Sequence, residues 1–199
     1  MSRLRVIPIV EGQGEESAVR ILLNRLWYEV FGGEYLDILR PIRRSRSLLA
    51  KTEELQKAVK LARAKLKNSP SEDPELILTL VDADSDPPCT LGPEWLQTAR
   101  DAVSDVPISC VFAKVEFETW FVGAAESLSA LVDVADSAEI PDEPENAGVG
   151  KNWIETRFRG TRYSPTVDQP KLTAAMDLQL CRPRCPSFDK LCRELERFL

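Results

Sequence analysis

Histidine is missing from this 199-residue chain, so the commonest general base near neutral pH is unavailable to it. Any catalysis must then depend on carboxylates, lysine, arginine or a bound metal ion. No apolar run is long enough to span a membrane, and the stretch 6–10 is too short for an export signal. We therefore expect a cytoplasmic protein without membrane contact.

Cysteine is sparse and irregularly placed. The five cysteines are an odd number and form no paired Cys-x-x-Cys knuckle; they are Cys89, Cys110, Cys181, Cys185 and Cys192. This pattern indicates reduced thiols in a cytosolic protein, and no zinc site is expected. The chain also lacks a phosphate-binding Gly-x-x-x-x-Gly-Lys-Ser/Thr loop, so any ATPase function would belong to another protein.

The composition is that of a globular protein, with 43% hydrophobic residues and a formal net charge of −6. The whole molecule should therefore not attract nucleic acid, although a local basic surface still could.

Apolar runs and helical periods alternate along the first part of the chain. Strands are predicted at 4–10, 35–39, 75–81 and 108–115, and helices at 15–30, 52–66 and from Pro93 to about 103. This order predicts an α/β fold with a largely parallel sheet over residues 1–123. Pro8 argues against a central position for the first strand, because proline cannot donate to a ladder.

The remainder of the chain, residues 124–199, reads as a mostly helical extension. It opens with an acidic stretch at about 133–145 that contains prolines and no cation. We interpret this stretch as a solvated loop.

Carboxylates follow two of the predicted strands at the edge where α/β proteins place their sites. Glu11 and Glu15 follow the first strand, and Asp82 and Asp84 follow the strand at 75–81. If strand geometry continues, Asp82 and Asp84 project to one side and can share an ion. Oxygen ligands of this kind suit Mg²⁺ or Mn²⁺. The structural alternative is that these acids open turns, which is our interpretation of Asp86.

Further candidates follow the other two strands. Glu116 and Glu118 precede Trp120 and Phe121, and we take Glu118 as the additional metal ligand; the alternative is a carboxylate that opens a helix. A basic stretch after the second strand is predicted to bind phosphate through Arg40, Arg43, Arg44 and Arg46. Lys151 in the C-terminal extension is a further predicted phosphate ligand. A solvated basic loop is the alternative for that stretch.

The Glu-Gly-x-x-Glu pattern at 11–15 and the Asp-x-Asp pattern at 82–84 resemble the Toprim domain. The chain is more closely similar to an uncharacterised bacterial Toprim-like family, domain of unknown function 4276. The blocks that resemble it are 6–12, 40–43, 116–121, 163–169 and 186–191. Gln13 and Pro165 depart from this pattern, where relatives often carry His and Lys.

The resemblance implies a Toprim-like fold and, by analogy with nucleases of the overcoming-lysogenisation-defect type, metal-dependent cleavage of nucleic acid in defence or repair. Glu11, Asp82 and Asp84 would be catalytic, with Glu15 and Glu118 as further ligands. One alternative is a non-catalytic subunit that works with a separate ATPase in phage defence. Another is phosphoryl transfer on a small nucleotide. A homodimer is left open.

Overall fold

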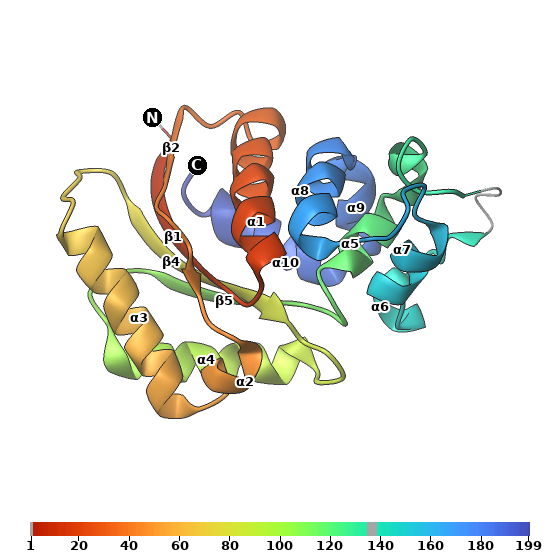
Figure 1. Ribbon diagram of the computed structural model, residues 1–199. Coiled ribbons are helices and arrows are strands. Elements are labelled where there is room, and N and C mark those ends of the chain that lie inside the picture. Colours follow the sequence, from red (N-terminus) through yellow and green to blue (C-terminus); the bar gives the residue numbers. More distant parts are fainter. Residues whose placement is uncertain (1, 135–138) are drawn as a thin grey trace.

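A computed structural model describes residues 2–134 and 139–199, and its centre is a parallel five-stranded sheet (Figure 1). The strand order is β2-β1-β4-β5, and β3 pairs with β1 beside β2. The strands are β1 (Arg3–Val10), β2 (Tyr35–Ile38), β3 (Ile42–Arg43), β4 (Glu75–Asp82) and β5 (Ile108–Ala113). The predicted α/β fold with a parallel sheet is therefore confirmed.

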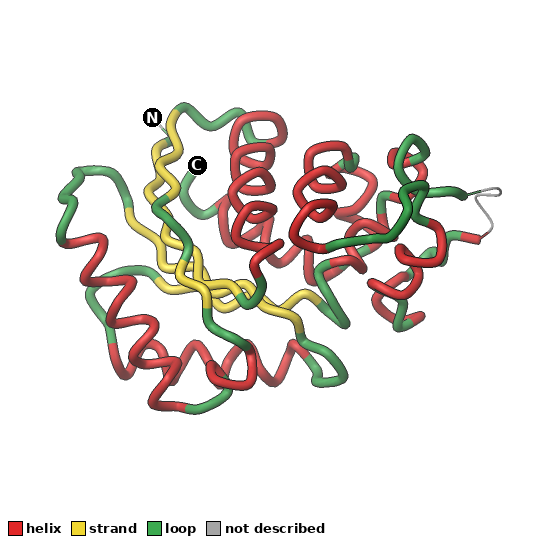
Figure 2. Tube along the Cα trace, in the orientation of Figure 1, coloured by secondary structure: helices red, strands yellow, loops and turns green. Residues whose placement is uncertain are grey.

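Helices cover both faces of this sheet, and a helical segment follows β5 (Figures 1 and 2). In the first part of the chain they are α1 (Gln13–Arg25), the π-helical turn η1 (Leu26–Val30), α2 (Arg46–Leu49), α3 (Thr52–Lys67) and α4 (Pro88–Ala102). After β5 they are α5 (Glu118–Gly123), the 3₁₀ turn η2 (Ala125–Leu128), α6 (Pro144–Ala147), α7 (Lys151–Arg157), α8 (Pro165–Ala175), α9 (Leu178–Arg184) and α10 (Pro186–Glu196). Among the described residues, no helix combines the length and the apolarity that a membrane crossing needs.

The sheet divides the core in two, because side chains alternate along each strand. Val6 and Val10 of β1 join the larger cluster, on the side of α1 and the C-terminal helices. Ile7 and Ile9 join the cluster under α3 and α4. Strands that are apolar on both faces are typical of a parallel sheet covered by two helical layers.

Pro8 lies in the central strand β1, so the expectation of an edge position was wrong. The carbonyl of Val6 accepts from Leu39 N (2.9 Å) and that of Val10 accepts from Arg44 N (3.0 Å). Even-numbered residues of β1 therefore direct their backbone groups toward β2 and β3. Pro8 falls opposite the break between these two short strands, where it displaces no ladder hydrogen bond.

Two helices begin at a proline, and one of them begins earlier than predicted. Helix α4 starts at Pro88 and contains Pro93, which was expected in its first turn. Helix α8 starts at Pro165. The fixed φ of proline suits the first helical position, which explains these starts.

The C-terminal helices share the larger core cluster with the sheet. Helix α8 packs along α1, and α10 packs on β5. The indole of Trp120 meets the ring of Phe188 edge to face at 5.2 Å between centroids. Glu145, at the end of the expected solvated loop, is buried and accepts from Ser187 N (3.0 Å), which corrects that interpretation locally. Asp136 of the same loop lies outside the described residues.

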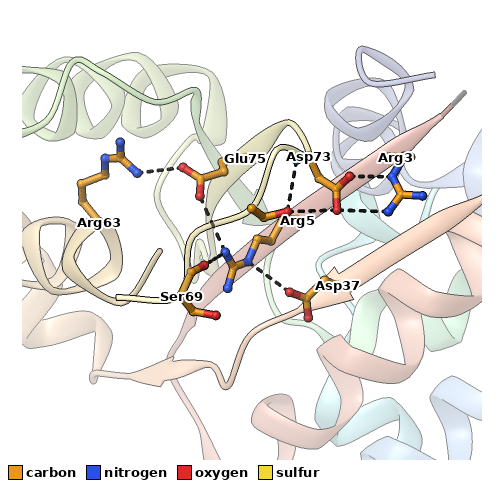
Figure 3. Close-up of polar contacts among 8 residues, drawn as sticks. Arg3, Arg5, Asp37, Arg63, Ser69, Asp73 and Glu75 are labelled. Carbon is orange, nitrogen blue, oxygen red and sulfur yellow. Dashed lines mark hydrogen bonds and ion pairs between the residues drawn. The ribbon is translucent and has the colours of Figure 1, made fainter. Parts of the chain in front are cut away.

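The amino ends of the strands carry an ion-pair network that centres on Arg5 (Figure 3). Arg5 is only 3% exposed; its Nε lies 3.1 Å from Asp37, and its guanidinium also donates to the Ser69 carbonyl. Glu75 at the start of β4 accepts from Arg63 Nη1 at 2.7 Å. The positive and negative charges of these groups are paired, so we interpret this edge of the sheet as structural. Several carboxylates at the opposite edge lack such pairing among the described residues.

Candidate metal centre

Four carboxylates converge at the carboxyl ends of β1 and β4. Glu11 follows β1 directly, and Asp82 is the last residue of β4. Glu15 lies in the first turn of α1, and Glu118 begins α5. Carboxyl ends of parallel strands form one edge of the sheet, which explains why side chains far apart in sequence meet here.

Glu15 turns back over the end of β1. Its side chain is buried, and Glu11 N donates to its Oε2 at 3.0 Å. Burial raises the pKa of Glu15 to about 7, and the nearby charges of Glu11 and Glu118 act in the same direction. The hydrogen bond from Glu11 opposes this shift without cancelling it.

Asp82 joins the strand end to the segment before α5. Its Oδ1 accepts from Phe117 N at 2.7 Å. Burial raises the pKa of Asp82 well above its ordinary value, and the charges of Glu15 and Glu118 raise it further. The ionisation of each of these carboxylates therefore depends on the charge of the others.

Glu118 is held by two partners that sequence reasoning did not assign. Tyr163 Oη donates to its Oε1 at 2.9 Å, and Gln169 Nε2 donates to the same oxygen at 3.0 Å. Glu118 is 3% exposed, and this burial raises its pKa. The only signal in the sequence was the block 163–169, which marked the segment without indicating what it contacts.

Gly14 sets the distance between α1 and α8. A Cβ at this position would lie 2.2 Å from Gln169 Oε1 and 2.5 Å from the Pro165 carbonyl oxygen. No side chain fits there, so glycine allows α8 to bring Gln169 to Glu118. The glycine in this turn is therefore needed for close packing, since its φ lies outside the left-handed region.

The negative charge of this cluster has no cationic partner among the residues that the structure describes. Within the described ranges, none of the four carboxylates of Glu11, Glu15, Asp82 and Glu118 forms an ion pair. Buried carboxylates need a counter-charge or a proton. The donor type and charge therefore suit Mg²⁺ or Mn²⁺. As the described side chains stand, however, no three acidic or cysteine residues form a ready ligand set.

Asp84 lies in a different environment from Asp82. The expectation that strand geometry continues between them was wrong, because Asp84 adopts a left-handed φ of 51°. Its side chain is 59% exposed and its Oδ2 lies 3.1 Å from Arg46 Nη1. Asp86 N donates to the Ala83 carbonyl at 3.0 Å, which is a turn hydrogen bond, and Arg46 also pairs with the Asp86 carboxylate.

The basic stretch reaches the same edge through β3, a strand that the sequence did not predict. Arg43 pairs in register with Val10, and Arg44 N donates to the Val10 carbonyl at 3.0 Å, so both flank the end of β1, directly before Glu11. Both side chains are exposed, and neither forms an ion pair with any described residue. They therefore remain able to contact an anion.

The other predicted phosphate ligands have partners. Arg40 lies 3.5 Å from Glu16, and Arg46 is engaged by the two aspartates that follow β4. Lys151 Nζ lies 3.7 Å from Glu155. The backbone N–H of Lys151 donates to Glu116 Oε2 at 2.7 Å, which ties the start of α7 to the segment before α5.

Comparisons with known proteins match this chain to one family. A family model with the description "Domain of unknown function (DUF4276)" matches residues 10–196. No curated protein and no solved structure matches. The matched range begins at the last residue of β1 and contains the other four strands, the helices to the end of α10 and all four carboxylates.

Proposed function

Because the chain belongs to the DUF4276 family, whose description states no activity, we propose its function from the site: a Mg²⁺- or Mn²⁺-dependent phosphodiesterase acting on nucleic acid. The observation that carries this proposal is the cluster of four carboxylates at the carboxyl edge of the sheet, two of them buried, that forms no ion pair with a described residue. The resemblance of the two acidic motifs to the Toprim domain supports the same reaction class, in defence or repair.

The ligands in this proposal are Glu11, Glu15, Asp82 and Glu118. A divalent ion bound among them would neutralise phosphate charge and lower the pKa of a water molecule. Glu11 is partly exposed and so reaches toward substrate, whereas Glu15 and Glu118 line the buried side. Asp84 stays a predicted ligand. To bind a metal ion, its carboxylate would have to release Arg46.

The chain's own cations complete the site. Arg43 and Arg44 extend from the strand next to Glu11, where their guanidinium groups can hold phosphate oxygens on either side of a scissile bond. Two such contacts fit a polynucleotide backbone, even though the chain carries a net charge of −6.

Cleavage assays on labelled DNA and RNA with Mg²⁺ or Mn²⁺ in excess, and with a chelator as the blank, test this proposal. Asp82→Asn keeps the acceptor for Phe117 N but removes the charge, and it should abolish cleavage while the protein stays folded. Asp86→Asn is the matched control in the same loop and should retain cleavage. Undiminished cleavage by the Asp82 variant would refute the proposed site.

One observation favours a second candidate, a non-catalytic subunit that works with a separate ATPase. Among the described residues, no three acidic side chains are arranged as ligands of one ion. This is the arrangement expected if the four carboxylates have a structural role. Calorimetric titration with Mn²⁺ separates the two: binding that disappears in Asp82→Asn supports the enzyme, and no binding supports the subunit.

A further inference from the structure

A groove between α4 and α10 lies apart from the carboxylate site. Both helices pack on β5, the last strand of the sheet (Figure 1). The groove has a volume of about 600 Å³, and of the residues that the structure describes, none of the four site carboxylates lines it. This volume is within the range of sites for small molecules.

The floor of this groove is closed. The strand residues that line it are buried, namely Ile108, Cys110 and Phe112. A Cβ on Gly92 would lie 3.8 Å from the Cys110 carbonyl oxygen, so α4 covers the strand at this point. An occupant of the groove therefore contacts side chains of the two helices and does not pair with the strand backbone.

The walls of the groove are apolar and rigid. Leu96 lines it together with four prolines, Pro87, Pro88, Pro93 and Pro186. Because the proline ring fixes φ, these walls lose little conformational freedom when a ligand binds. A preformed apolar space of this kind favours an alkyl chain, which gains free energy for each methylene removed from water.

The charges that reach solvent at the rim of the groove are positive. The lining cations are Lys114, Lys190, Arg193 and Arg197. All of them except Lys114 are exposed. The two lining carboxylates, Glu145 and Glu194, are buried, with only 4% and 7% of their surface exposed. An anion would therefore be attracted to this rim although the whole chain is acidic.

The excess positive charge lies at Lys190 and Arg197. Both share the single carboxylate of Glu194, whose third partner is Ser109 Oγ at 2.5 Å. Arg193, between them on α10, is paired with Asp189 at 2.9 Å. Two cations on one carboxylate leave one positive charge over, which one carboxylate of a ligand would balance.

We propose that this groove binds a medium-chain alkyl carboxylate, with its chain between α4 and α10 and its carboxylate at Lys190 and Arg197. The groove follows β5, whose six residues span about 20 Å, which is long enough for an extended alkyl chain. The apolar walls disfavour a sugar or a nucleotide, and the rim disfavours a cationic amphiphile. The proposal is independent of the metal-dependent reaction.

Calorimetric titration of the full chain with hexanoate, octanoate and decanoate, in buffer with a chelator, tests the proposal. We expect saturable binding of one molecule that tightens about fourfold for each added methylene. Decan-1-ol and decylammonium, with the same chain, should bind at least tenfold more weakly than decanoate. An affinity that is independent of chain length, or equal for the three decyl compounds, would overturn the proposal.

Gly92→Leu tests where the chain binds. Apart from neighbouring residues of α4, the Cys110 oxygen is the only described atom within 4 Å of a Cβ at Gly92, so the leucine fills the groove without displacing the fold. Leucine is also a better helix former than glycine. The variant should bind decanoate more than tenfold more weakly, and Glu94→Leu, on the same helix outside the groove lining, should bind normally. Undiminished binding by Gly92→Leu would refute this location.

Arg197→Gln tests the head group and leaves Lys190 on Glu194. It should weaken the binding of decanoate about tenfold and leave that of decan-1-ol unchanged, whereas Lys60→Gln, an exposed cation on α3, should change neither. An equal loss for both ligands would overturn the assignment of the carboxylate to this rim. Sedimentation with phosphatidylcholine vesicles that Gly92→Leu abolishes would also contradict the proposal, since it would assign the groove to the acyl chains of a membrane.

Discussion

The charge of Glu15 should make the metal-free protein less stable as pH rises. In the unfolded chain this carboxyl titrates near its ordinary value of 4.5, whereas in the fold its pKa is about 7. Between these values the folded state holds a proton that the unfolded state has released, so the free energy of unfolding falls as pH rises. The contribution is absent below about 4.5 and complete above about 7.

The size of the effect follows from that difference. At 1.36 kcal/mol for each pKa unit, the rise from 4.5 to about 7 corresponds to a loss of about 3 kcal/mol. Asp82 shifts in the same direction and adds to the loss. Glu15→Gln removes the charge and retains an oxygen that can accept from Glu11 N, so its free energy of unfolding should decline less with pH.

Urea unfolding followed by the fluorescence of the four tryptophans, from pH 4.5 to pH 8, measures this difference. Comparison with the wild type at each pH cancels the opposite contribution of carboxyls whose pKa is lowered by an arginine, such as Asp73 beside Arg3. Glu16→Gln, one residue further along α1, controls for the loss of a carboxylate outside the cluster. Parallel curves for wild type and Glu15→Gln over the whole range would refute the reasoning.

Three further predictions concern the groups that build the two edges of the sheet. Gly14→Ala should lower the free energy of unfolding by about 1–3 kcal/mol in urea titrations, because its methyl group would overlap Gln169 and Pro165; an unchanged midpoint would contradict the close packing. Arg5→Ala should lower the free energy of unfolding by about 1–3 kcal/mol in the same assay, because it removes a buried guanidinium that pairs with Asp37 and donates to the Ser69 carbonyl, while Glu75 keeps Arg63; an effect no larger than that of Arg3→Ala would contradict this. Tyr163→Phe should raise the pKa of Glu118, since it removes a donor to the ionised carboxylate. Titration of the carboxyl group by NMR or infrared spectroscopy measures this pKa, and an unchanged or lowered value would contradict the prediction.

Much of the fold could be predicted from the sequence because parallel strands and their covering helices leave strong apolar patterns. The two-residue strand β3 left none, since Ile42–Arg43 is too short for any period. The prediction from Pro8 was wrong for a physical reason. Whether a proline removes a ladder hydrogen bond depends on what lies opposite it, and the break between β2 and β3 is a tertiary feature that the sequence does not reveal.

The candidate site was predictable only where residues follow a strand directly. Glu11 and Asp82 could be placed together from strand order, but the left-handed turn at Asp84 and its pairing with Arg46 depend on the loop conformation. The contacts of Glu118 with Tyr163 and Gln169 span 45 and 51 residues, and no local pattern indicates them.

The central claim is that the carboxylate cluster binds a divalent cation, and crystals soaked in Mn²⁺ test it most directly. The account predicts an anomalous peak about 2.0–2.3 Å from oxygens of Glu11 and Asp82 and from Glu15 or Glu118. It predicts that this peak is absent in crystals of Asp82→Asn soaked in the same way. A cluster that stays free of manganese at pH 8, or manganese bound only at the exposed aspartates after β4, would contradict the claim.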